Sequence, residues 1–61
     1  MVGRPIDQYS DEDLEIVLES LRHEQALNEY VDDHKLYLRN NERIQHNIFA
    51  VKREQERRKT A

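Results

Sequence analysis

The chain has 61 residues and no Cys, and its ten Lys and Arg against thirteen Asp and Glu give a net charge of -3. This length allows one small domain, and the absence of Cys excludes disulfide frameworks, thiolate metal sites and cysteine nucleophiles. No apolar run exceeds four residues, whereas a membrane span needs about 20. We therefore expect a cytoplasmic protein without a signal peptide and with no membrane contact.

The apolar content is small but sufficient for a folded chain. Leu, Ile, Val and Phe make up 15 of the 61 residues, above the roughly 20% below which disorder is typical. A lone domain of this size buries a thin core, and no disulfide supports it. Oligomerisation is the usual remedy, so a homodimer is expected.

The first third of the chain predicts a leader followed by a helix. Gly3 and Pro5 are the only strong helix breakers, so residues 1–9 are predicted to form an extended leader. Ser10 is a good N-cap, and the acidic residues that follow it suit the positive end of a helix dipole. Apolar residues on one face then predict a short acidic helix from about Asp11 to His23.

The apolar stripe of this helix stops after Leu21. Polar residues occupy the positions that would continue it, namely Glu24, Gln25 and Asn28. This loss of phase predicts a tight turn within residues 22–26.

A second, longer helix is predicted from about Ala26 to Arg58, within a single helical domain at 10–59 and before a tail at 60–61. A break at Asn40–Asn41 is an alternative, since Asn both ends and caps helices. The apolar pattern keeps its phase across this pair, which favours one unbroken helix.

The second helix carries a heptad-like seam with alternating spacings of three and four. Its members are Leu27, Tyr30, His34, Tyr37, Asn41, Ile44, Ile48 and Val51. The predicted fold is therefore all-α: a helical hairpin that dimerises through this seam as a coiled coil or a four-helix bundle.

Two members of the seam are polar, and each has two interpretations. His34 is either an interface residue between Tyr30 and Tyr37 or a pH switch at a dimer interface. Asn41 either sets the register of the seam or marks a break in the helix.

The charge is divided along the chain, with a net of -8 over residues 1–33 and +5 over residues 34–61. The basic C-terminal segment makes nucleic-acid binding an alternative function, since cations neutralise phosphates. The Gly3-Arg4-Pro5 segment also resembles the short arms that some DNA-binding domains lay in the minor groove. The candidate residues are Arg4, Lys52, Arg53, Arg57, Arg58 and Lys59. Against this reading, Glu54 and Glu56 are interleaved, and Glu54 is spaced to pair with Arg58.

No catalytic, cofactor or metal site is expected. The three His residues are spaced 11 and 12 apart, so no two of them stand at the i,i+4 spacing at which neighbouring His residues on one helix face bind a metal together. Few hydroxyl side chains are present, and two helices offer no pocket of the usual size. We therefore expect a chain that is not an enzyme.

The function favoured by these patterns is binding. We predict a small regulatory or inhibitory protein that occludes a protein target, with Ile16, Leu36 and Phe49 as partner-binding candidates. Compact, Cys-free, charge-rich chains of this kind are typical of phage accessory proteins. A nucleic-acid-associated protein and a structural coiled-coil component are the alternatives.

Overall fold

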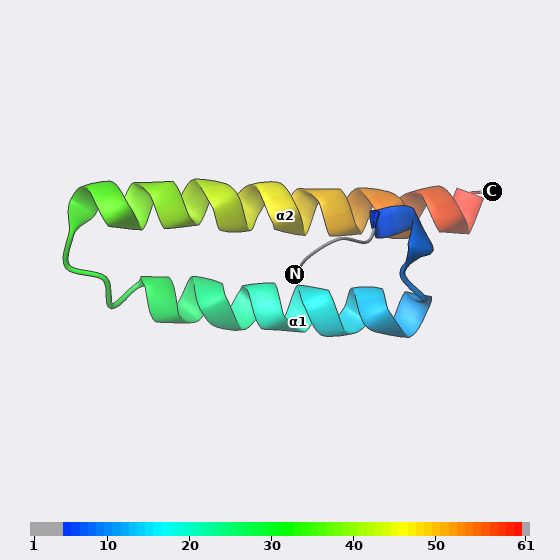
Figure 1. Cartoon of the computed structure of the whole chain (residues 1–61), viewed down its shortest axis with the longest axis horizontal. Coiled ribbons are helices and arrows are strands. Elements are labelled where there is room, and N and C mark those ends of the chain that lie inside the picture. The colour runs from blue at the N-terminus through cyan, green and yellow to red at the C-terminus, as the bar shows by residue number, and fades with distance from the viewer. Residues whose placement is uncertain (1–4, 61) are drawn as a thin grey trace.

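The computed structural model describes residues 5–60, and over this range the chain is an all-helical hairpin (Figure 1). A short 3-10 helix, η1 (Ile6–Gln8), precedes α1 (Asp11–Asn28), and α2 (His34–Thr60) follows a loop. The two long helices lie side by side and antiparallel, with η1 against the C-terminal end of α2. The predicted all-α hairpin is confirmed.

The start of α1 follows the predicted cap. The backbone N–H of Asp13 donates to Ser10 Oγ at 3.0 Å. Three acidic residues fill the first turn, where the helix dipole favours negative charge.

The predicted end of α1 at His23 and the turn at 22–26 are wrong, because α1 continues to Asn28 and the loop lies at 29–33. Glu24 does not end the helix. It faces α2 and pairs with Arg43 at 2.8 Å. The stripe that holds the hairpin together therefore continues through polar residues after its apolar part has ended.

Asn28 completes this polar part of the interface. Its Nδ2 donates to the carbonyl oxygen of Tyr37 at 3.1 Å, and its Oδ1 accepts from Asn40 Nδ2 at 3.1 Å. Asn28 is buried, and a buried amide is tolerated only when its polar groups are bonded. Paired polar groups therefore close the hairpin beside its loop.

The predicted start of the second helix at Ala26 is also wrong, because α2 begins at His34. Asp33 Oδ1 accepts from the backbone N–H groups of Lys35 and Leu36, at 3.0 and 3.3 Å, which is the geometry of an N-cap. From there α2 crosses Asn40–Asn41 without a break, so the prediction of one continuous helix at that pair is confirmed.

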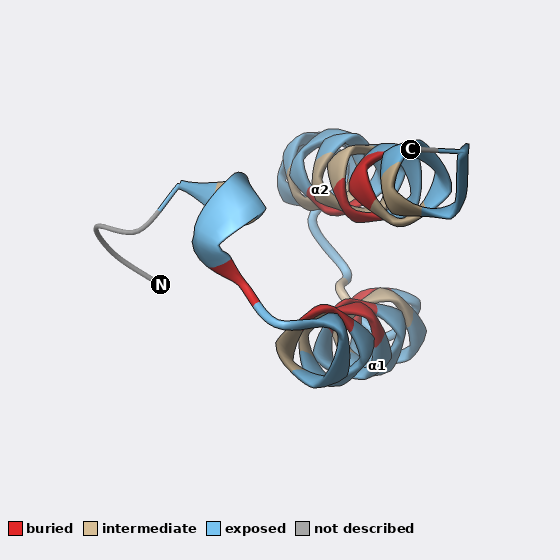
Figure 2. Ribbon diagram, turned by 90° about the vertical axis from the view of Figure 1, so that its right-hand side faces the viewer, coloured by how far each residue is buried: buried red, intermediate tan, exposed pale blue. Residues whose placement is uncertain are grey.

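The core lies between the two helices, whose buried segments face one another (Figure 2). Its cluster of buried side chains consists of Tyr9, Leu14, Leu18, Leu21 and Val51. Ile44 is also buried, nearer the start of α2 than Val51.

The predicted extended leader is wrong at Ile6–Gln8, which form η1, although Pro5 and Tyr9 on either side have extended backbone; residues 1–4 lie outside the described part. Tyr9 is buried in the core, and Ile6 packs against it from η1. Arg58 Nη2 donates to the carbonyl oxygen of Tyr9 at 2.6 Å. Apolar packing and this charged hydrogen bond fold the segment back onto α2.

Candidate binding surfaces

The predicted dimer seam is divided between the loop, both helices and the core. Ile44 and Val51 are buried within one chain, so they cannot pack against a second chain unless the hairpin opens. Leu27 belongs to α1 and Tyr30 to the loop. Val51 packs against Leu14, Leu18 and Leu21 of α1 in the same chain, so part of the seam is used to close the hairpin.

The remaining seam residues lie at the margins of this core. Tyr37, Asn41 and Ile48 are half-buried. His34 is exposed at the first position of α2 and does not lie between Tyr30 and Tyr37 on one helix. Association between chains stays a prediction, but the seam does not form one continuous surface for it.

The basic C-terminal segment is partly neutralised within the chain. Glu54 is buried and accepts from Arg57 Nη2 at 2.6 Å and from Arg58 Nε at 2.8 Å. These hydrogen bonds, that of Arg57 first, lower the pKa of Glu54 to about 2. Arg58 also pairs with Asp11 at 2.7 Å, and these carboxylates raise its pKa.

Among the nucleic-acid candidates, the cations therefore differ in availability. Arg58 is paired within the chain, where it joins the N-terminal segment to the C-terminal end of α2. Arg57 stays exposed although it pairs with Glu54. Lys52, Arg53 and Lys59 are exposed, and Arg4 lies outside the described residues.

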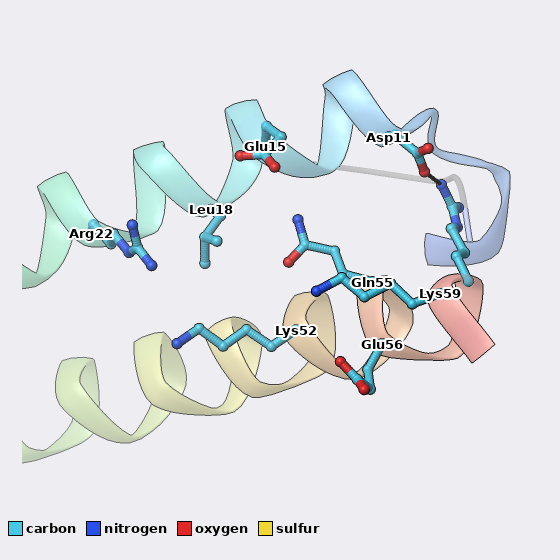
Figure 3. A pocket seen from close by; sticks show the side chains of 9 residues that line it. Asp11, Glu15, Leu18, Arg22, Lys52, Gln55, Glu56 and Lys59 are labelled. Carbon is cyan, nitrogen blue, oxygen red and sulfur yellow. Dashed lines mark hydrogen bonds and ion pairs between the residues drawn. The ribbon is translucent and has the colours of Figure 1, made fainter.

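A hollow of about 540 Å³ lies between the helices near the chain ends (Figure 3). Lys52 and Gln55 extend into it from α2, and the Asp11–Arg58 pair closes one end. Its lining carries both signs of charge, since Glu15 and Glu56 line it together with Lys52. A mixed lining of this kind selects neither a cation nor an anion.

Residues 5–60 hold no group of three or more His, Asp or Glu side chains placed to bind a metal ion. Within the same range, neither long helix combines the length and the apolar character that a membrane crossing requires.

A second hollow, of about 600 Å³, lies where α2 meets η1 and is lined by residues of both elements. Phe49, Ala50 and Ile6 give it an apolar floor, and Phe49 is 66% exposed. Its other lining residues are His46, Arg53, Glu54 and Arg57. Because Glu54 is already bonded to two guanidinium groups, the rim is basic. We call this site the Phe49 hollow.

The three predicted partner-binding residues do not form one surface. Ile16 lies on the outer face of α1, about 200° around the helix from the fully buried Leu14. Phe49 lies on the outer face of α2, on the opposite side of the hairpin, and Leu36 lies near the loop. Phe49 lines a hollow of the described structure, and the contribution of Ile6 to that hollow was missed because the leader was predicted to be extended.

Comparison of the chain with protein-family models, with curated proteins and with solved structures gives no match.

Proposed function

We propose that this chain is a small non-enzymatic protein-binding module that regulates or inhibits its target by covering a surface of it. The observation that carries the proposal is the Phe49 hollow, whose apolar floor includes a large aromatic side chain that is two-thirds exposed. Its composition supports protein binding, because aromatic and Arg side chains are enriched among the residues that dominate interface energies.

The basic rim indicates the chemistry of the target. Arg53 and Arg57 flank the floor, and such charges steer an acidic surface toward the site and orient it. Full burial of a Phe side chain contributes about 1.5–3 kcal/mol, so Phe49 supplies the affinity and the cations supply orientation.

Affinity capture from a lysate of the native host, treated with nuclease, tests the proposal. The tagged wild-type chain should retain a stoichiometric protein, and Phe49→Ala should lose it. The matched control is Tyr30→Ala, because Tyr30 is 83% exposed but lies in the loop, outside the hollow. Equal retention by wild type and Phe49→Ala would contradict the proposal.

Nucleic-acid association has a distinct outcome in the same experiment. Recovery of nucleic acid without nuclease, with loss of every captured protein on digestion, would favour binding by Lys52, Arg53 and Lys59. That binding should also fall steeply between about 50 and 200 mM salt, whereas contact through Phe49 should not.

A further inference from the structure

Each helix carries a row of exposed side chains on its outer face, away from the core. The α1 row consists of Glu12, Ile16, Glu19, His23 and Leu27; the α2 row, taken in reverse chain order, consists of Arg53, Phe49, His46, Glu42 and Leu38. The spacing is four, three, four and four in both rows, so each follows one side of its helix. Both rows are accessible in the folded hairpin.

We propose that a second copy of this chain docks its α1 row on the α2 row of the first copy. Paired in antiparallel order, the two rows match at every position. Ile16 meets Phe49, and Leu27 meets Leu38, which places an apolar pair at each of two levels. Glu12 meets Arg53, so opposite charges pair at one end of the contact.

The two positions between the apolar pairs also match. Glu19 meets His46, and His23 meets Glu42, so each imidazole faces a carboxylate that can accept its N–H. No position brings two like charges together. The helices as wholes are complementary too, because α1 has six acidic residues and one Arg, whereas α2 has eight basic and three acidic residues.

The register of this docking lies close to the alignment that the hairpin itself has. A copy displaced at right angles to the helices keeps the alignment found inside the hairpin, where Glu24 lies opposite Arg43 and Asp11 lies opposite Arg58. That alignment brings Ile16 of one copy to within about one helical turn of Phe49 of the next. A sliding of one copy along the helix axis by no more than about one turn therefore brings the two rows into register.

The geometry also determines the kind of assembly. The two rows lie on opposite sides of the hairpin, so each docked pair leaves one free α1 row and one free α2 row. Such head-to-tail contacts grow into open stacks and do not close as a symmetric dimer. Because a docked α1 covers the Phe49 hollow, stacking and target binding exclude one another; this consequence rests on the proposed function.

The contact is small, since the ten side chains span about four turns of helix, or about 22 Å. Interfaces of this size are weak and transient. We therefore expect stacking at chain concentrations of about 0.1–1 mM, with a free monomer at about 1 μM.

Sedimentation velocity with two blocked variants tests the stack. Ile16→Gln removes the apolar contact from the α1 row, and Phe49→Gln removes it from the α2 row, so each variant alone should remain monomeric. In an equal mixture, the intact α1 row of Phe49→Gln meets the intact α2 row of Ile16→Gln. The mixture should form a 1:1 dimer and nothing larger.

Circular dichroism on each variant checks that the hairpin is retained, and Tyr30→Ala, which is outside both rows, should stack as the wild type does. A second pair of variants tests the register. Glu12→Arg should weaken association at least about threefold, and Glu12→Arg with Arg53→Glu should restore it.

A wild-type chain that stays monomeric at about 1 mM, or a variant mixture that stays monomeric or grows beyond a dimer, would overturn the stack. Target capture is measured at about 1 μM, where the chain is monomeric. If the chain does not stack but still captures its target, the stack is rejected and the proposed function stands. If the chain stacks but captures no target, the proposed function alone is rejected.

Discussion

Asn28 is buried at the end of α1, and both polar groups of its side chain are bonded to α2, one to the Tyr37 carbonyl and one to Asn40. Asn28→Ala would leave a carbonyl and an amide without these partners, so we expect the free energy of unfolding to fall by about 1–3 kcal/mol. Urea unfolding measures this change. The matched control is Asn41→Ala, at a half-buried position, which should shift stability by less than about 0.5 kcal/mol.

Glu54 makes the stability of the folded chain depend on pH. Its pKa is lowered from 4.5 to about 2, so the ionised carboxylate stabilises the folded state above pH 4.5, and this stabilisation is lost as the pH falls toward 2. We expect Glu54→Gln to be less stable at neutral pH and to lose less stability over that acidic range. The exposed Glu56→Gln should keep the wild-type pH dependence, and an equal slope in Glu54→Gln and wild type would rule out this role.

At the scale of the element, Asp33 determines where α2 begins, because its carboxylate caps the first turn. Asp33→Ala should lower the free energy of unfolding by about 1 kcal/mol. Asp32→Ala removes the same charge from the preceding loop position, which makes no such cap, and should cost less than about 0.5 kcal/mol. Thermal unfolding of the two variants measures the difference, and equal losses would assign the effect to charge alone.

The sequence predicts that helices form, and where α1 begins, better than it predicts where α1 ends. Ser10 was sufficient to place the start of α1, because its capping bond is local. The end of α1 was misplaced because Glu24 and Asn28 break the apolar pattern. Glu24 pairs with Arg43, and Asn28 bonds to Tyr37 and Asn40. All of these partners lie on α2, so the spacing of residues within α1 does not reveal them.

The N-terminal segment did carry a local signal that the prediction did not use. Tyr9 precedes the cap and Leu14 follows it at the fourth helical position, which is the pattern of a hydrophobic staple; both are buried in one cluster. The Phe49 hollow was predictable only in part. Phe49 was identified as a binding candidate, but Ile6 reaches the hollow through the fold of the whole chain.

At the scale of the whole molecule, the buried Tyr9 ties the N-terminal segment to both helices, so the small core depends on it. Tyr9→Ala should lower the free energy of unfolding by about 3 kcal/mol or more, which is most of the stability that a chain of this size has. The control is Tyr30→Ala, at a Tyr that is 83% exposed. Circular dichroism against temperature should show a large loss for Tyr9→Ala only, and equal midpoints would contradict the role of Tyr9.

The distribution of apolar side chains over the hairpin leaves apolar surface exposed for binding. Six hydrophobic residues are buried among those described, whereas six large hydrophobic side chains are exposed. Ile16 and Phe49 belong to the exposed set and point away from the core on opposite sides. A hairpin closed partly by polar contacts thus folds with apolar groups left on its outer faces, where they are available for binding.

A concentration series of nitrogen–proton NMR correlation spectra, from about 20 μM to about 1 mM, distinguishes binding by these outer faces from pairing through the heptad seam. We expect the shifting amides to cluster at Ile16 and Phe49 and along their helix faces, while Ile44 and Val51 in the core stay unchanged. Shifts concentrated at Ile44 and Val51 would mean that the hairpin opens and pairs through the seam, which would contradict a folded module that works through its outer faces.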